Sequence, residues 1–217
     1  MSTAAKEERI PETDIVFAIT ATSSRWNNNL QHMKDAITSI LDTFSMDLMR
    51  VGVIVFGGEV DTSISIQSNL DNSLQADVGR LLPKFGVPDL KSALSVAKNV
   101  FQTSGRTNAR KVIVVISDRR SGSSQEDIEA EVDRLTEENI VLICVVIGNE
   151  ADPKELKKFT PHEVTKTTPD ENPKELGEKI IILVLKGKKI LIEYVVKSCN
   201  IAVQKICLFP LLGLVGI

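Results

Sequence analysis

The chain has 217 residues, of which 42% are hydrophobic and 25% are charged, and its formal net charge is −3. This length fits one domain of ordinary size plus an extension. The slightly acidic balance argues against electrostatic binding of nucleic acid, and the 4% aromatic content argues against binding by base stacking.

The amino terminus, MSTAAKEERIPET, contains no apolar segment of the kind that secretory signals carry. We therefore expect either a protein that stays inside the cell or a chain that is a partial or processed product.

Five segments are predicted to form strands: 14–20, 50–57, 60–66, 111–117 and 140–148. Four of them are continuous apolar runs, which is typical of strands covered on both faces by helices. The exception is 60–66, where apolar residues and threonine alternate with aspartate and serine, so we expect an edge strand with one solvent face. The short turn GGE before it predicts antiparallel pairing with the preceding strand.

Apolar residues spaced by three and four predict helices between the strands, over 30–44, 93–101, 128–135 and 176–184. Alternating strands and helices favour a parallel sheet. The predicted fold is α/β: a Rossmann-like, doubly wound and mostly parallel sheet, with one antiparallel edge strand and helices on both faces.

The character of the chain changes after Lys186. The segment 187–189, GKK, marks a predicted domain boundary, and the closing apolar run 206–217 is shorter than the roughly 20 residues that span a bilayer. Two interpretations stay open: an appended tail, or a membrane-associating segment, which the length disfavours. Cys144 is interpreted as a core residue, whereas pairing of Cys199 with Cys207 is left open.

Hydroxyl and carboxylate side chains follow two of the predicted strands. Thr20, Thr22 and Ser24 come after the first strand, and Asp118 comes after the fourth. Because carboxyl ends of parallel strands meet at one edge of a sheet, these oxygens and Asp89 are expected to approach one another. Hard oxygen ligands suit Mg²⁺ or Ca²⁺. The alternative is that the hydroxyls cap the following helix.

Neither histidine indicates catalysis. His32 falls within the first predicted helix and His162 in a loop, and both are interpreted as surface or half-buried residues. The basic residues around the fourth strand are interpreted as a solvated surface, of which Arg119 and Arg120 flank the possible metal site; the full set is Arg106, Arg110, Lys111, Arg119 and Arg120.

The order of segments along this chain resembles that of the von Willebrand factor type A domain found in integrins, collagens and matrilins. The segments are DIVF, the hydroxyl loop, RVGVIVFGG, SALSVAKNVF, RKVIVVISDRRS and IVLICVVIGN. The resemblance divides the chain into an amino-terminal extension (1–12), the domain itself (13–186) and a hydrophobic carboxyl-terminal extension (187–217). It implies a metal-ion-dependent adhesion site (MIDAS), where Mg²⁺ receives a carboxylate from a partner protein.

The family writes this site as Asp-x-Ser-x-Ser, a threonine from a second loop, and an aspartate after the fourth strand. Here Ser24 matches, Thr22 keeps a hydroxyl, and Asp118 matches the last aspartate, so these three are the implied metal ligands. Thr20 replaces the leading aspartate, and the second-loop threonine falls at or near Pro88. Each charge about 4 Å from a cation contributes roughly 4 kcal/mol at an effective dielectric of 20. The expectation is therefore that no metal is required, with Mg²⁺ or Ca²⁺ binding as the alternative.

The resemblance implies a non-enzymatic, extracellular module of cell-adhesion or matrix type, which binds a partner protein through the top face. One alternative is an intracellular scaffold in a multiprotein assembly, which the missing signal segment favours. A second is a nucleotide-binding Rossmann-like enzyme. Its best feature is Gly57-Gly58 after a strand, but the G-x-G-x-x-G spacing is missing and a hairpin follows.

Overall fold

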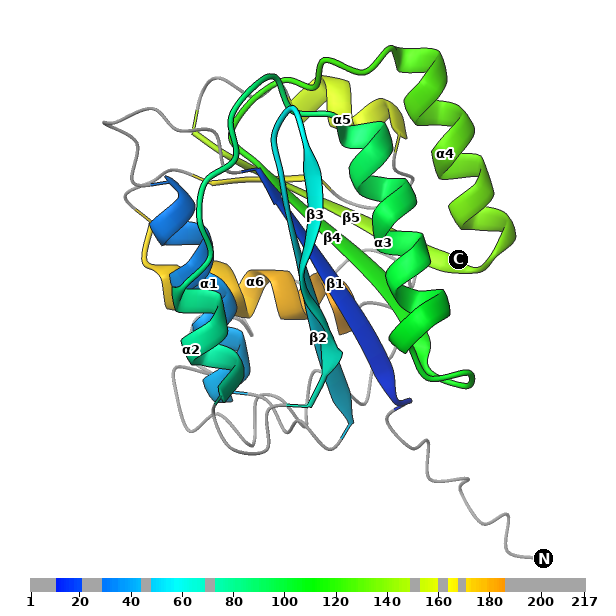
Figure 1. Ribbon diagram of the computed structural model, residues 1–217. Helices are drawn as coiled ribbons and strands as arrows, with labels where there is room; N and C mark the ends of the chain where they lie inside the picture. Colours follow the sequence, from blue (N-terminus) through cyan, green and yellow to red (C-terminus); the bar gives the residue numbers. More distant parts are fainter. Residues whose placement is uncertain are drawn as a thin grey trace, which may run out of the picture.

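A six-stranded sheet of order β3-β2-β1-β4-β5-β6 organises the computed structural model (Figure 1). The structure describes residues 11–20, 29–43, 48–68, 73–148, 153–159, 164–167 and 171–185. The strands are β1 Thr13–Thr20, β2 Met49–Phe56, β3 Val60–Gln67, β4 Arg110–Ser117, β5 Ile140–Ile147 and β6 Val164–Thr167. The helices are α1 Asn29–Thr43, α2 Ser73–Gly79, α3 Leu90–Ser104, α4 Gln125–Glu137, α5 Pro153–Phe159 and α6 Pro173–Leu185.

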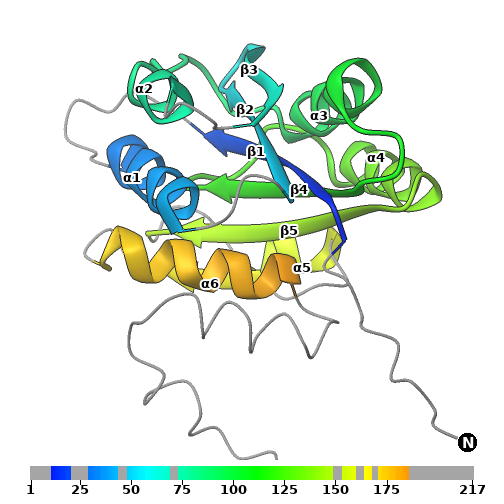
Figure 2. The same ribbon diagram turned by 90° about the horizontal axis from the view of Figure 1, so that it is seen from below.

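The strand directions confirm the predicted fold. All neighbouring pairs are parallel except β2 and β3, which are antiparallel. The two views agree that α1 and α6 cover one face of the sheet, while α3 and α4 cover the other (Figures 1 and 2). The five predicted strands end within one residue of their expected limits.

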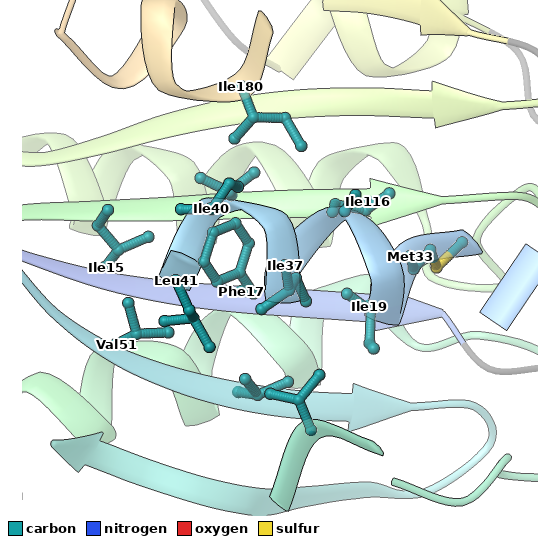
Figure 3. Packing of buried hydrophobic residues seen from close by; sticks show 14 of the residues in the cluster. Ile15, Phe17, Ile19, Met33, Ile37, Ile40, Leu41, Val51, Ile116 and Ile180 are labelled. Atoms are coloured by element: carbon teal, nitrogen blue, oxygen red, sulfur yellow. The ribbon is translucent and has the colours of Figure 1, made fainter. Parts of the chain in front are cut away.

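The central strand β1 is buried along its whole length. Ile15, Phe17 and Ile19 pack toward α1 and α6, where Figure 3 shows Phe17 among the isoleucines of α1. Val16 and Ala18 point to the layer of α3 and α4. A strand covered on both faces has to be apolar at every interior position, which is why β1 lacks alternation.

Three described elements were not predicted from the sequence. The strand β6 has only four residues, and α2 and α5 have seven each. Elements this short contain at most one or two periods of an apolar pattern, so their periodicity is weak. The proposed carboxyl-terminal extension lies outside the described residues, as do His162, Cys199 and Cys207. Among the helices that the structure describes, none is both long and apolar enough to cross a membrane.

The edge strand β3 departs from the predicted alternation. Ile64 and Ile66 were expected on one face, but they lie in opposite core layers. The pairing moves from Val53↔Ile64 to Val51↔Gln67, which leaves one extra residue in β3. Such a bulge reverses the side-chain direction. The backbone N–H of Ile66 donates to the Ser104 hydroxyl of α3 at 3.4 Å.

A buried ion pair fixes the amino end of β1. Asp14 is fully buried, and its carboxylate accepts from the Arg106 side chain at 2.8 Å and from the Arg106 backbone N–H at 2.6 Å. The same guanidinium donates to the carbonyl of Leu48, next to β2, at 3.1 Å. Arg106 therefore joins the α3–β4 loop to two strands.

The interpretation of Arg106 and Arg110 as solvated surface charges is wrong. The Arg106 side chain is only 15% exposed. Arg110 donates to the carbonyl of Val184 near the end of α6, and its burial lowers the pKa of the guanidinium. A cation at a helix carboxyl end is favourable because the last carbonyls lack intrahelical partners.

Substituting Arg106→Met is expected to lower the free energy of unfolding by about 3–5 kcal/mol, because it leaves the buried Asp14 carboxylate without its counter-charge. The matched control is Arg80→Met, which breaks an exposed ion pair with Asp77. It is expected to cost no more than about 0.5 kcal/mol. Urea titration of both variants measures the difference, and equal effects would contradict the structural role of Arg106.

Cys144 is a core residue, as the sequence predicts. It is 1% exposed, and burial raises the pKa of its thiol to about 12. Because the thiolate is the reactive form, we expect iodoacetamide at mildly alkaline pH to leave Cys144 unmodified in the folded protein and to alkylate it in urea. Peptide mass spectrometry measures this, and alkylation without denaturant would show that the β5 core opens.

Candidate functional site

Three buried polar side chains meet where β1 and β4 end. The Thr20 hydroxyl donates to Asp118 Oδ1 at 2.8 Å and accepts from the Asp118 backbone N–H at 3.0 Å. Asn29, the first residue of α1, donates from Nδ2 to Asp118 Oδ2 at 3.0 Å. Thr20 is 1% exposed, Asn29 is 6% exposed and Asp118 is 4% exposed. We call this set the hydrogen-bond lock.

The structure brings only part of the predicted metal site into view. Asp118 lies at the expected strand end, whereas Thr22 and Ser24 lie outside the described residues. Within the described part of the chain, no three His, Cys, Asp or Glu side chains gather where they could hold a metal ion. Both Asp118 oxygens accept hydrogen bonds from neutral donors. A single carboxylate engaged in this way does not fit the charge that a hard divalent cation needs.

Asp89 serves as a helix cap at the start of α3. Its carboxylate accepts from the Ser92 backbone N–H at 3.0 Å, from the Ser92 hydroxyl at 2.6 Å and from the Ser123 hydroxyl at 2.8 Å. Partial burial opposes ionisation, but these hydrogen bonds and the nearby Lys91 outweigh it and lower the pKa of Asp89. The carboxylate thus stabilises α3 and the adjoining loop.

Backbone contacts join three loops at this end of the sheet. The N–H of Asp89 donates to the Gly57 carbonyl at 3.0 Å, and the N–H of Gly122 donates to the Pro88 carbonyl at 2.8 Å. The Ser121 hydroxyl also donates to the Pro88 carbonyl and accepts from the Leu90 N–H. We call the loops 57–59, 81–89 and 118–124, together with the lock, the upper rim.

The pair Gly57-Gly58 has a packing role here. A side chain at Gly57 would place its Cβ only 2.8 Å from the carbonyl oxygen of Phe85, and the N–H of Gly58 donates to that oxygen at 2.7 Å. Glycine is required because the two backbones touch. The nucleotide-binding alternative therefore loses the feature on which it rested.

The loop 81–89 carries three large apolar side chains into solvent. Leu82, Phe85 and Val87 are 74%, 76% and 66% exposed, and we call them the apolar ridge. Among the described residues these are the exposed large hydrophobic side chains. Beside Val87 lies a shallow groove of about 420 Å³, lined in part by Lys91, Ser123 and Asp127. The ridge was not predicted from the sequence.

His32 is buried rather than at the surface or half-buried as expected. It is 7% exposed, one turn after Asn29 on α1. Arg119 and Arg120 remain at the upper rim, half-buried and exposed respectively, immediately after the Asp118 backbone that Thr20 contacts. The rim thus presents an apolar surface at one place and cationic groups at another.

Comparison with known families identifies the domain type. The model of the von Willebrand factor type A domain matches residues 14–179. Among curated proteins, the collagen alpha-1(XX) chain of Mus musculus is 29% identical over 150 residues, which cover 66% of this chain and 11% of that collagen. The chain therefore corresponds to a small part of this relative.

Solved structures share the fold. Proximal thread matrix protein 1 from the mussel byssus superposes with a TM-score of 0.71 at 21% identity, covering 80% of this chain and 48% of that one. Another structure of the mussel protein has a zinc-occupied MIDAS motif. It gives a TM-score of 0.69 at 20% identity, with coverage of 80% and 46%. The chain thus spans about half of the mussel protein.

Substituting Asp89→Ala is expected to cost about 1 kcal/mol of unfolding free energy at neutral pH, because α3 loses its cap. The folded-state pKa is lowered, so this contribution is complete above the unfolded pKa of about 3.9 and declines as the pH falls below it. The wild type and the variant should therefore converge on acidification. The exposed Asp133→Ala on α4 is the control, and denaturant titrations across acidic pH measure both. If the difference in unfolding free energy between wild type and Asp89→Ala grows as the pH falls, the stabilisation does not come from the ionised Asp89 carboxylate.

Proposed function

Because this chain belongs to the von Willebrand factor type A domain family, we propose that it is a non-enzymatic protein-binding module of adhesion or matrix type. Domains of this family generally mediate protein interactions, and the relatives with significant similarity include a collagen and a thread matrix protein. The binding surface that we propose is the upper rim, and the partner is a matrix protein.

The observation that carries the proposal is the apolar ridge. Leu82, Phe85 and Val87 stand in solvent within six residues of one another, each at least 66% exposed. Single exposed apolar side chains are ordinary, but several together on one loop are typical of protein-binding surfaces. Burying each in a partner would contribute about 1.5–3 kcal/mol before the costs of association.

The ridge is held in place before any partner arrives. The carbonyl of Phe85 accepts from Gly58, and Lys84 forms an ion pair with Asp61 of β3. On the other side, Pro88 is tied to Gly122. A loop that is already ordered loses little conformational entropy on binding, so more of the contact energy appears as affinity.

The location that we propose is extracellular. The collagen and the thread matrix protein to which the chain is similar are extracellular matrix proteins. Detection of the full-length protein in culture medium by immunoblotting tests this location. Retention in the cytosol with no secreted fraction would favour the intracellular scaffold instead.

Substituting Phe85→Ser is expected to weaken binding to a matrix partner at least about tenfold, because it removes the largest apolar contact of the ridge. The probes are purified collagens, fibronectin and laminin on a biosensor surface, tested with EDTA present. The control is Gln102→Ser, an exposed residue near the far end of α3. An unchanged melting temperature shows that Phe85→Ser folds.

Two outcomes would contradict the proposal for the ridge. One is that a matrix probe binds wild type and Phe85→Ser equally. The other is that none of the probes binds the wild type at all. Binding that falls equally in the Gln102→Ser control would place the contact surface elsewhere on the domain.

A further inference from the structure

We infer that Thr20, Asn29 and Asp118 do, without a cation, the structural work of the family's metal site, and that Thr20 is the residue that sets this behaviour. The family joins the ends of its first and fourth strands through a metal ion. Here the same two strand ends are joined by reciprocal hydrogen bonds between Thr20 and Asp118. This inference concerns the lock itself and does not depend on the proposed partner.

In the lock, each oxygen of the buried Asp118 carboxylate accepts a hydrogen bond from a different residue. Thr20 donates to one Asp118 oxygen at 2.8 Å, and Asn29 donates to the other at 3.0 Å. Hydrogen bonds to an ionised acceptor are roughly twice as strong as those between neutral groups. Because Asp118 is 4% exposed, water contributes little to its solvation, and the protein donors take that role.

A cation arriving at Asp118 would meet a carboxylate whose two oxygens each already accept a hydrogen bond. Each oxygen keeps a second lone pair, but the hydrogen bond that it already accepts draws on its charge, so it attracts a cation less strongly. The ion would then find one negative charge among the described residues of the lock, which is less than hard divalent cations rely on. The hydrogen bonds of the lock and a bound cation therefore compete for the same carboxylate charge.

Thr20 sets this outcome because it both donates and accepts. An aspartate at position 20 could still accept from the Asp118 backbone N–H, but it could not donate to Asp118 Oδ1 when ionised. Two carboxylates would then face each other in a buried site and repel. A divalent cation would relieve that repulsion, so Thr20→Asp should convert a cation-indifferent rim into a cation-dependent one.

The test is thermal unfolding of the domain in EDTA and in millimolar Mn²⁺, Mg²⁺ or Ca²⁺, with calorimetric titration of MnCl₂. Wild type is expected to melt within about 1 °C in all conditions, since a cation that does not bind cannot stabilise it. Thr20→Asp is expected to melt about 5–10 °C lower in EDTA and to recover at least half of this loss with a cation.

Two further substitutions show whether the charge or the shape of the side chain at position 20 causes the response to cations. Thr20→Asn has nearly the shape of aspartate without its charge, and its amide can both donate and accept, so its melting temperature should not respond to cations. Thr20→Ser keeps the hydroxyl and should behave as wild type. The test also works if Thr20→Asp is unfolded in EDTA. Addition of Mn²⁺ should then restore the folded signal of Thr20→Asp.

Three results would overturn the inference. The first is a cation-induced rise in the melting temperature of wild type that Asp118→Asn abolishes. The second is a Thr20→Asp variant that responds to cations no more than Thr20→Asn does. The third is a Thr20→Ser variant that melts as low in EDTA as Thr20→Asp does.

Discussion

The complete burial of β1 is the constraint on which the rest of the domain depends. A strand with helices on both faces has polar groups only at its ends, and each end must find partners inside the protein. Asp14 finds Arg106 at the amino end, and Thr20 finds Asp118 at the carboxyl end. Both partners come from the segments that flank β4, about 90 residues later in the chain. The two contacts therefore fix β1 against β4 at opposite ends of these two strands.

The two ends achieve this by different chemistry. The amino end uses full charges, with a guanidinium that also donates to the backbone carbonyls of Thr13 in β1 and of Leu48 before β2. The carboxyl end uses a hydroxyl and an amide around one carboxylate. An ion pair is strong but demands a matching charge, whereas neutral donors satisfy an aspartate without one. We infer that these donors compensate for the loss of the family's leading aspartate at position 20, so that a cation is unnecessary for holding the strands.

The sequence predicted the layered architecture because its long apolar runs and helical stripes are strong, local signals. It predicted Asp118 at a strand end for the same reason. It did not predict the bulge that separates Ile64 from Ile66, since the extra residue is visible only once β2 and β3 are paired. Nor did it predict the burial of Arg106, whose partner Asp14 is distant in the chain. The apolar ridge was missed because Leu82, Phe85 and Val87 follow no period of two or 3.6.

If the upper rim is held without a cation, as we propose, a partner would bind it through contacts other than a metal ion. In the family pattern a metal ion receives a carboxylate, so much of the contact is electrostatic. Here the described part of the upper rim exposes apolar side chains, Arg120 and a groove with a paired Lys91 and Asp127.

Three anchors at about 1.5–3 kcal/mol each give a gross contribution near 5–9 kcal/mol, against association costs of about 4–15 kcal/mol. A single domain binding through the ridge alone would therefore bind weakly. Presentation of several copies together would raise the effective concentration of each copy, and such multivalency would strengthen binding through weak sites.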